Sequence, residues 1–322
     1  MLQYAQEVGA TAGRSLRKYH HCPPLLRHPL YTRDDSMAPP TAIVTGACSG
    51  IGLALTKHLL ALQWHVFMAD VNAPPETLEN TTFVRTDIAS WSEQAALFKQ
   101  AYDAQGRLDF CGLNAGISDR DDIFNNISSD PSKPPAEPNV KTIDVNFTGQ
   151  YYGIKLAAHY MNLDSSAAGK KQLGGKVVIT ASGSGIFPIS AVPVYSATKH
   201  ALVGLVRSLG PISQAKNVCI NAIAPAMVAT NLPEPGFLEL FPPEQITPMS
   251  TIMRSFDAVA DFQDVEKEDW VQKGKSGEIV EGNLQDLIWH PSPERPAQSE
   301  YLNEEGMKVW TDVYAKKLAA KQ

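Results

Sequence analysis

Residues 41–52 read Thr-Ala-Ile-Val-Thr-Gly-Ala-Cys-Ser-Gly-Ile-Gly, and this stretch decides the fold class. Its apolar run at 42–44 predicts a short buried strand that ends at a glycine turn. Leu55, Leu59 and Leu62 then recur at helical spacing, which predicts an amphipathic helix over residues 51–62. A strand, a glycine turn and a helix in this order predict an α/β domain with a parallel sheet.

The glycines of this turn, Gly46, Gly50 and Gly52, have a spacing that suits a pyrophosphate. The first allows a tight turn, and the other two let a phosphate and the helix come close to the backbone. The start of the helix adds free N–H groups and a partial positive charge. A purely structural turn uses the same residues, but the flanking strand and helix favour a nucleotide site.

A second predicted strand, residues 65–69, ends at Asp70, which lies 18 residues after Gly52. A carboxylate at this place accepts hydrogen bonds from an adenosine ribose and repels a 2′-phosphate. No Lys or Arg stands at 47–49 or 71–72 to neutralise such a phosphate. The sequence therefore favours NAD(H) over NADP(H), with a cap on the loop after the strand as the alternative interpretation of Asp70.

Further elements follow at the spacing of a doubly wound sheet. Residues 83–88 predict a strand and its loop, with Asp87 where an adenine amine would lie and the apolar Ile88 beside it. A helix is expected at 91–105, and a fourth strand at 108–113 ends in Asn114-Ala115-Gly116. We therefore expect a single-domain, Rossmann-type parallel sheet of about seven strands with helices on both faces.

A buried strand at 176–180 is followed by Ser182, and Tyr195 comes thirteen residues later at the start of a predicted helix. Lys199 stands four residues after Tyr195, so both lie on one helix face. An ammonium near a phenol favours the phenolate and lowers its pKa of about 10 toward a useful range. The serine hydroxyl can hydrogen-bond a substrate oxygen as charge develops on it.

Two other sites fit parts of this pattern. Tyr151 and Lys155 have the same spacing, but no serine at a strand end precedes them, so we interpret them as structural helix residues. Ser184 competes with Ser182, but it lies 11 rather than 13 residues before Tyr195, and we expect it to have a minor role.

Together, and in this order, these motifs resemble the short-chain dehydrogenase/reductase family in its compact one-domain form. The family's T-G-x-x-x-G-I-G loop matches residues 45–52, and its N-A-G matches residues 114–116. Residues 193–204 are particularly similar to the NAD-dependent 15-hydroxyprostaglandin dehydrogenase-like members. The resemblance covers about residues 40–230.

The resemblance implies an oxidoreductase that transfers a hydride between NAD(H) and a secondary alcohol or ketone. Its implied catalytic tetrad is Asn146, Ser182, Tyr195 and Lys199. Tyr195 would exchange the proton, Ser182 would orient the oxygen, Lys199 would hold the nicotinamide ribose, and Asn146 would hold a water. The implied cofactor contacts are Gly46, Ser49, Gly50, Ile51, Gly52, Asp70, Asp87, Ile88, Asn114, Ala115, Gly116, Tyr195, Lys199, Pro225, Val228 and Thr230; no metal site is expected.

One position departs from the family pattern, in which a glycine follows the proline of the nicotinamide-side loop. Here Ala226 follows Pro225, and its methyl group restricts the backbone. We still expect Val228 and Thr230 to meet the carboxamide.

The predicted substrate wall is apolar. Phe187, Pro188, Ile189 and Val192 follow the catalytic serine, and Met227 with residues 232–241 would lie above the nicotinamide. We therefore expect a secondary alcohol or ketone on an apolar skeleton, which can include a ring. Residues 231–263 are proline-rich at first and then helical, as is typical of a substrate lid.

The catalytic domain is expected at residues 37–283, between two extensions. Residues 1–36 are basic and lack the apolar run of a secretory signal, so we expect a disordered tail, with a mitochondrial transit peptide as the alternative. Residues 284–322 exceed what the fold needs and would contact a partner subunit or cover the pocket. The acidic insertion at 118–139 is expected to be a solvated loop rather than a metal site.

Composition limits the partners. A net charge of −6 gives no electrostatic argument for nucleic acid or an anionic membrane surface, and no run of 18 apolar residues predicts a spanning helix. Four scattered cysteines favour a reducing compartment, here the cytoplasm. We expect a small apolar alcohol or ketone as ligand and a homodimer or homotetramer. A cyclase-like enzyme of the same fold, a non-catalytic dinucleotide sensor and an NADP(H)-linked ketone reductase remain alternatives.

Overall fold

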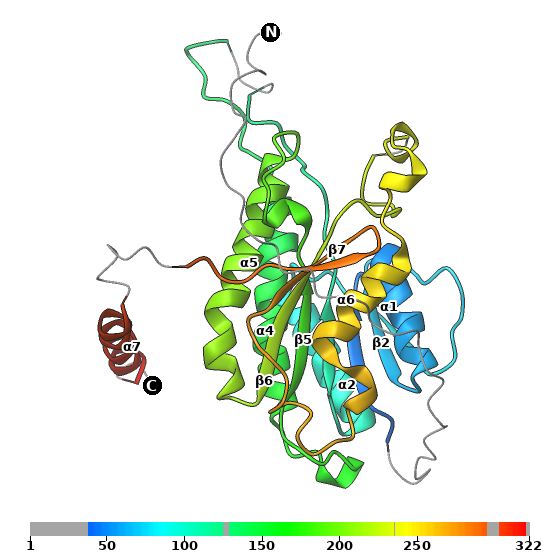
Figure 1. The fold of residues 1–322 in the computed structure, drawn as a ribbon. Coiled ribbons are helices and arrows are strands. Elements are labelled where there is room, and N and C mark those ends of the chain that lie inside the picture. Colours follow the sequence, from blue (N-terminus) through cyan, green and yellow to red (C-terminus); the bar gives the residue numbers. More distant parts are fainter. Residues whose placement is uncertain (1–37, 125–128, 235, 295–302, 320–322) are drawn as a thin grey trace. The chain divides into compact units, whose positions relative to one another are not determined.

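The structure, a computed structural model, describes residues 38–124, 129–234, 236–294 and 303–319. Its centre is a sheet (Figure 1). The strand order is β3-β2-β1-β4-β5-β6-β7-β8, and only β7 and β8 pair antiparallel. The strands are β1 (Thr41–Thr45), β2 (His65–Asp70), β3 (Thr81–Arg85), β4 (Phe110–Leu113), β5 (Gly175–Thr180), β6 (Val218–Pro225), β7 (Ile279–Asn283) and β8 (Asp286–Trp289).

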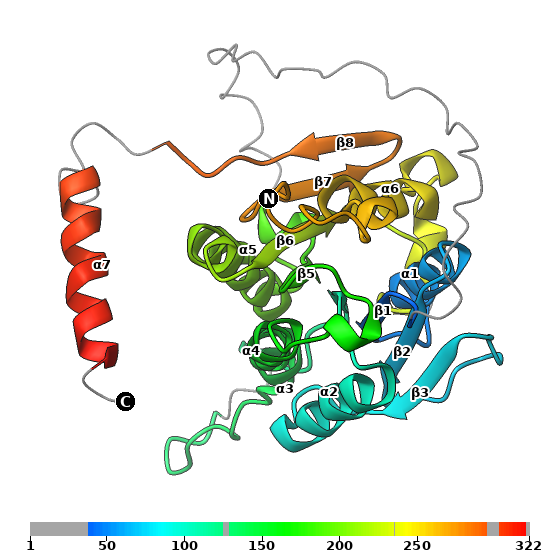
Figure 2. The same ribbon diagram turned by 90° about the horizontal axis from the view of Figure 1, so that it is seen from below.

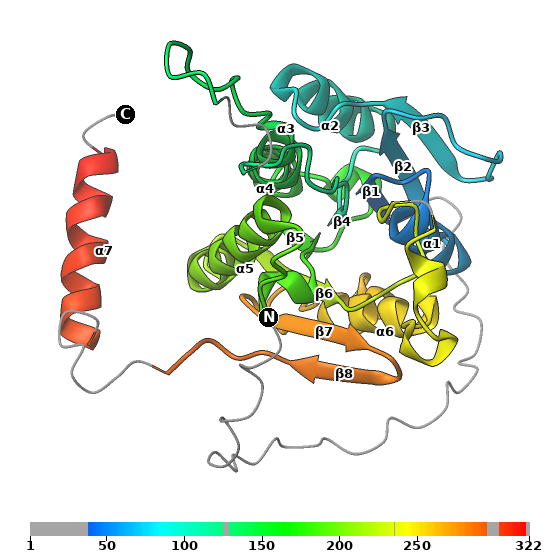
Figure 3. The same cartoon turned by 90° about the horizontal axis from the view of Figure 1, so that it is seen from above.

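Helices cover both faces of this sheet, as the views along it show (Figures 2 and 3). One face carries α1 (Gly50–Ala61) and α6 (Met249–Ala260), and the other carries α2 (Trp91–Gln105), α4 (Gln150–Met161) and α5 (Pro193–Gln214). Every residue of β1, β4, β5 and β6 is buried, as expected for strands covered on both sides. The predicted doubly wound α/β fold is therefore confirmed.

Two apolar cores lie between the sheet and its helices. Leu97 of α2, Ile154 of α4 and Leu202 of α5 belong to one core, and Leu55 of α1 and Phe256 of α6 belong to the other. Because the helices are fixed by these cores, the loops that follow the strands start from defined positions.

The strand order reverses around β1, whose neighbours β2 and β4 belong to the two halves of the fold. In an open α/β sheet, ligands bind beyond the carboxyl ends of the strands at such a reversal. The loops after β1, β2, β4, β5 and β6 carry most of the residues that the sequence assigns to the site.

The structure corrects two of the predicted boundaries. The sheet continues past residue 283, because β8 turns back through Leu284, with a left-handed φ of 51°, and pairs with β7. This adds an eighth strand to the seven expected. The predicted lid at 231–263 is also too long, because α6 carries the buried core residues Ile252 and Phe256 and is part of the helix layer.

Short helical turns complete the described chain. They are α3 (Lys141–Ile143), the π-helical η1 (Asp144–Gly149), and the 3₁₀ turns η2 (Ser166–Ala168), η3 (Gly183–Gly185), η4 (Leu238–Leu240), η5 (Pro243–Gln245) and η6 (Phe262–Asp264). The C-terminal helix is α7 (Glu304–Ala319). The predicted tail, residues 1–36, lies outside the described residues. Among the helices that are described, none has the length and apolar character needed to cross a membrane.

Candidate active site

Lys199 lies at the centre of the candidate site, in the second turn of α5. Its side chain is buried, and Nζ donates a hydrogen bond of 2.7 Å to the carbonyl oxygen of Thr180 at the end of β5. Burial disfavours the ammonium form and lowers the pKa of Lys199 to about 7. This lysine is therefore partly neutral near pH 7.

Tyr195 lies in the first turn of the same helix, and its ring centre is 5.4 Å from Lys199 Nζ. Burial raises the pKa of the phenol, and a hydrogen bond with Ser182 opposes that rise. We expected Lys199 to lower the pKa of Tyr195, but in this structure the opposing group is Ser182. The reason is that Lys199 points its ammonium at Thr180 and its burial favours the uncharged form.

The two serines after β5 have different surroundings. Ser182 Oγ accepts a hydrogen bond of 3.1 Å from the backbone N–H of Ser184, and Ser182 also lowers the pKa of Tyr195. Ser184 is 2% exposed, and its hydroxyl has no partner among the described residues. Of the two serines, Ser182 is the one that interacts with Tyr195.

Asn146 lies in the π-helical turn η1, where the helix formed by α3, η1 and α4 is locally widened. Its Nδ2 donates to the carbonyl oxygen of Ile117 at 2.9 Å and to Thr198 Oγ1 at 3.2 Å, and its Oδ1 accepts from Ile117 N–H at 2.8 Å. A Cβ placed on Gly116 would lie 3.3 Å from Asn146 Oδ1 and 3.5 Å from Lys199 Nζ. Asn146 and Lys199 therefore face the same loop, and Tyr195 lies beside Lys199.

The second Tyr-x-x-x-Lys pair is elsewhere. Tyr151 and Lys155 are both exposed on α4. Because both side chains are exposed on the helix surface, they do not line an enclosed site that could bind a substrate.

The glycine loop after β1 forms a tight cradle. Gly46 and Gly50 have positive φ values of 63° and 49°, and a Cβ on Gly52 would lie 2.1 Å from the Gly46 carbonyl oxygen. The exposed N-cap residue Ser49 makes no side-chain cap, and the first turn of α1, which includes Ile51, has no acidic residue. These features fit the pyrophosphate of a dinucleotide, because the first N–H groups of the helix remain for an anion.

The loop after β4 is held beside this cradle. Thr45 Oγ1 accepts the backbone N–H groups of Asn114 (2.9 Å) and Ala115 (3.1 Å), and Asn114 Oδ1 accepts from Thr180 Oγ1 at 3.0 Å. The Ala115 carbonyl accepts from the buried Gln150 Nε2 at 2.5 Å. Sequence reasoning missed Gln150, although its position four residues after Asn146 was a usable signal.

At the expected adenosine end, Asp70 has one of the two roles considered for it, the cap on the loop after the strand. Its Oδ2 accepts from the Cys48 N–H and its Oδ1 from the Asn72 N–H, each at 3.0 Å, so it orders the loop. A carboxylate oxygen can accept more than one hydrogen bond, so ribose hydroxyls could still bind. The sequence missed a neighbouring cation: Arg85 is the partner of Asp70 in the β2–β3 register, and its side chain is largely exposed.

The side chains of Asp87 and Ile88 have different surroundings. Asp87 accepts from the Ala89 N–H at 3.0 Å and forms an ion pair of 3.3 Å with Lys141, a second cation that the sequence analysis missed at this edge. Ile88 is buried, and its side chain contacts Gly149. Little of the Ile88 side chain is therefore exposed for the expected contact with the cofactor.

The nicotinamide-side loop accommodates the alanine that departs from the family pattern. Ala226 N–H donates to Gly282 O at 3.0 Å, and Ala226 is not among the described non-glycine residues with positive φ. The added methyl group thus causes no left-handed strain. Val228 forms a parallel bridge with Thr247, and the Thr230 methyl carbon lies 3.2 Å from where a Cβ on Gly50 would be.

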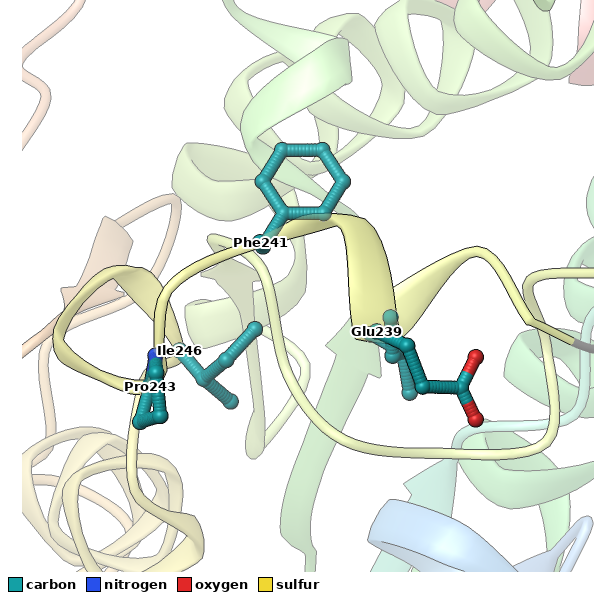
Figure 4. A pocket seen from close by; sticks show the side chains of 5 residues that line it. Glu239, Phe241, Pro243 and Ile246 are labelled. Atoms are coloured by element: carbon teal, nitrogen blue, oxygen red, sulfur yellow. The ribbon is translucent and has the colours of Figure 1, made fainter.

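Residues 229–246 form a loop whose two ends meet at this Val228–Thr247 bridge. The loop contains an open hollow of about 650 Å³, lined by Leu238, Glu239, Phe241, Pro243 and Ile246 (Figure 4). No tetrad residue lines it, so the hollow belongs to the proposed lid and not to the chemical centre. Among the described residues, no cluster of three or more His, Cys, Asp or Glu side chains could hold a metal ion.

The fold and the glycine cradle are thus those of a nucleotide-binding α/β domain. The profile of the family described as short chain dehydrogenase matches residues 40–237, and the chain belongs to this family.

Similarities to individual proteins agree with this assignment. The chain is 41% identical over 192 residues to the short-chain dehydrogenase/reductase prx4 of Penicillium roqueforti, a match covering 59% of this chain and 55% of that relative. It is 30% identical over 207 residues to human 15-hydroxyprostaglandin dehydrogenase [NAD(+)], covering 60% of this chain and 70% of that enzyme. The structure of ElxO with NADP bound has the same fold, with a TM-score of 0.59, 21% identity and coverage of 76% of this chain and 97% of that one.

Proposed function

We propose that this protein is an NAD(H)-linked dehydrogenase or reductase that interconverts a secondary alcohol and a ketone on an apolar skeleton. One observation carries the proposal: the Tyr195 phenol lies beside the buried Lys199 and near enough to Ser182 for that serine to lower its pKa. A proton-transfer group and a donor for the same oxygen are what this reaction requires of the protein.

The glycine cradle at Gly46, Gly50 and Gly52 would hold the pyrophosphate, and Asp70 would hold the adenosine ribose. The bound nicotinamide would supply the hydride acceptor or donor. Lys199 and Asn146, which face Gly116 together, would lie on the nicotinamide side.

The residues of the chain supply the proton chemistry. In reduction, the Tyr195 O–H gives its proton to the substrate oxygen as negative charge develops there; in oxidation, the phenolate takes the hydroxyl proton. Ser182 donates a hydrogen bond to the same oxygen and fixes its direction. Lys199 is held by Thr180 beside the Tyr195 ring, where it would bind the nicotinamide ribose.

NAD(H) is the proposed cofactor because the Asp70 carboxylate would repel a 2′-phosphate. The name of the human relative, which specifies NAD(+), supports this choice. Arg85 and Lys141 argue in the other direction, and ElxO binds NADP. The ratio of activity with the two cofactors therefore tests Asp70 directly.

An apolar substrate is proposed because two loops expose hydrophobic side chains after strands that end at the site. Phe187 and Ile189 follow β5 and are 61% and 50% exposed, and Leu232, Phe237 and Leu240 follow β6 with exposures of 39% to 76%. Exposed apolar groups concentrated on binding loops indicate a ligand surface. Residues 231–248 remain the proposed lid.

The cytoplasmic location and the homo-oligomeric state are likewise our predictions. The described cysteines, Cys48, Cys111 and Cys219, are free and buried, which suits a reducing compartment.

The experiment that tests the function is turnover with NADH and NADPH, or their oxidised forms, over a panel of apolar ketones and secondary alcohols. Nicotinamide fluorescence measures binding in parallel. We expect turnover, with NAD(H) preferred. Strong NADPH preference would overturn the role of Asp70, and cofactor binding without any turnover would favour the sensor alternative.

A further inference from the structure

Asp119 belongs to the insertion after β4, yet its carboxylate contacts the catalytic helix. Oδ2 accepts a hydrogen bond of 3.1 Å from the backbone N–H of Val194, and Oδ1 accepts one from the backbone N–H of Tyr195. A carboxylate about 75 positions away in sequence thus binds the first turn of α5. Charge-assisted hydrogen bonds of this kind are stronger than neutral ones.

These two N–H groups have no partner within the helix. The helix begins at Pro193, which has no N–H, and the first intrahelical bond runs from Ser196 N–H to Val192 O at 2.9 Å. The N-cap residue, Val192, makes no side-chain cap. Asp119 therefore caps α5 from another loop. Its carboxylate accepts hydrogen bonds from N–H groups that an N-cap side chain normally binds.

The backbone that carries Asp119 is fixed on its other side. Ile117 exchanges two hydrogen bonds with the Asn146 side chain, and the Ser118 carbonyl accepts from Thr142 Oγ1 at 3.1 Å. Gly116, the preceding residue, faces Lys199 Nζ. Residues 116–119 thus form a short bridge from the predicted cofactor loop, past Asn146, to the backbone of Tyr195.

Two other carboxylates of the insertion accept hydrogen bonds from within the insertion itself. Asp121 accepts from the Asn139 N–H at 3.0 Å, and Asp130 accepts from the backbone and hydroxyl of Ser132. Asp119 reaches the backbone of Tyr195, so a generally solvated loop does not account for its contacts.

We propose that Asp119 is a positioning residue: its carboxylate holds the first turn of α5 so that the Tyr195 phenol stays aligned with Ser182 for proton transfer. This inference rests on the proposed function of Tyr195. Small displacements of a reacting group can lower rates by about a hundredfold, so the loss of this contact should affect turnover more than binding.

The test compares Asp119→Ala, Asp119→Asn and the matched control Asp121→Ala. We expect Asp119→Ala to lower kcat at least about tenfold while KM for the cofactor changes little, because the glycine cradle is untouched. Asp119→Asn keeps one acceptor oxygen and should recover part of kcat, and it preserves the test if the alanine variant folds poorly. Asp121→Ala should retain the wild-type kcat. Equal losses in Asp119→Ala and Asp121→Ala, or an unchanged kcat in Asp119→Ala, would overturn the proposal.

Amide hydrogen exchange over residues 193–199 separates this inference from the proposed function. Faster exchange in Asp119→Ala, with protection recovered in Asp119→Asn, is expected whether or not a substrate has been found. Unchanged exchange in Asp119→Ala would contradict the proposal that Asp119 stabilises the first turn of α5. Absence of turnover in the wild type would contradict the proposed function alone.

Discussion

Lys199 Nζ lies 5.4 Å from the centre of the Tyr195 ring, but it donates its hydrogen bond to the backbone of Thr180. Burial lowers the pKa of Lys199 to about 7 and raises the pKa of Tyr195. The ammonium therefore loses its proton at a lower pH than the phenol does. In this structure the hydrogen bond with Ser182, and not the lysine charge, opposes the rise in the phenol pKa.

The buried lysine makes stability depend on pH. Its pKa is about 7 in the folded protein, against an ordinary 10.5, so between these values the unfolded chain binds a proton that the folded protein does not. The contribution of Lys199 to the free energy of unfolding should therefore increase with pH above about 7, by up to about 1.4 kcal/mol per pH unit. Below pH 7 both states are protonated and the contribution should be constant.

Urea unfolding of the wild type and Lys199→Met from pH 6 to 9 measures this contribution as a difference. The difference should change little from pH 6 to 7 and should then increase in favour of the wild type. A constant difference up to pH 9 would show that Lys199 stays protonated in the folded protein.

The serines after β5 provide a matched pair. Ser182→Ala should lower kcat by about a hundredfold, since it removes a donor to the substrate oxygen. It should also move the pH profile of alcohol oxidation upward, because the Ser182 hydrogen bond lowers the pKa of Tyr195. Ser184→Ala should keep the wild-type activity, because its buried hydroxyl has no partner in the described part of the chain. Comparable losses in the two variants would show that the assignment of Ser182 is wrong.

Two glycines make a similar comparison for the cofactor site. Gly52→Ala places a methyl group 2.1 Å from the Gly46 carbonyl oxygen, so the cradle must open and nicotinamide fluorescence on binding should be lost. Gly204, in α5, has no atom within 4 Å of its would-be Cβ. Gly204→Ala should therefore leave binding unchanged and stabilise the protein by up to about 1 kcal/mol. Normal cofactor affinity in Gly52→Ala would contradict the predicted phosphate site.

The sequence predicted the elements whose signals are local. The buried strands after residues 41 and 175, and the helix at 91–105, follow from apolar runs and periodicity. The helix carrying Tyr195 and Lys199 is equally clear, because the four-residue spacing is fixed by helix geometry.

What the sequence did not predict depends on contacts between distant segments. The Asp119–Tyr195 backbone contact and the Gln150–Ala115 hydrogen bond join residues far apart in the chain, and no local pattern encodes either. The direction of the Lys199 pKa shift depends on burial by surrounding elements, which spacing does not reveal. The predicted end of the lid, residue 263, lies too far along the chain for the same reason. The amphipathic pattern of α6 does not reveal that this helix packs on the sheet.

The most direct measurement of the central claim is kcat of Tyr195→Phe on an alcohol or ketone that the wild type turns over, at saturating cofactor. Tyr151→Phe, at the exposed tyrosine of the second Tyr-x-x-x-Lys pair, is the control. If Tyr195 transfers the proton, Tyr195→Phe should lose at least about a hundredfold in kcat while nicotinamide fluorescence still reports cofactor binding, and Tyr151→Phe should match the wild type. Near-wild-type turnover in Tyr195→Phe would contradict the account.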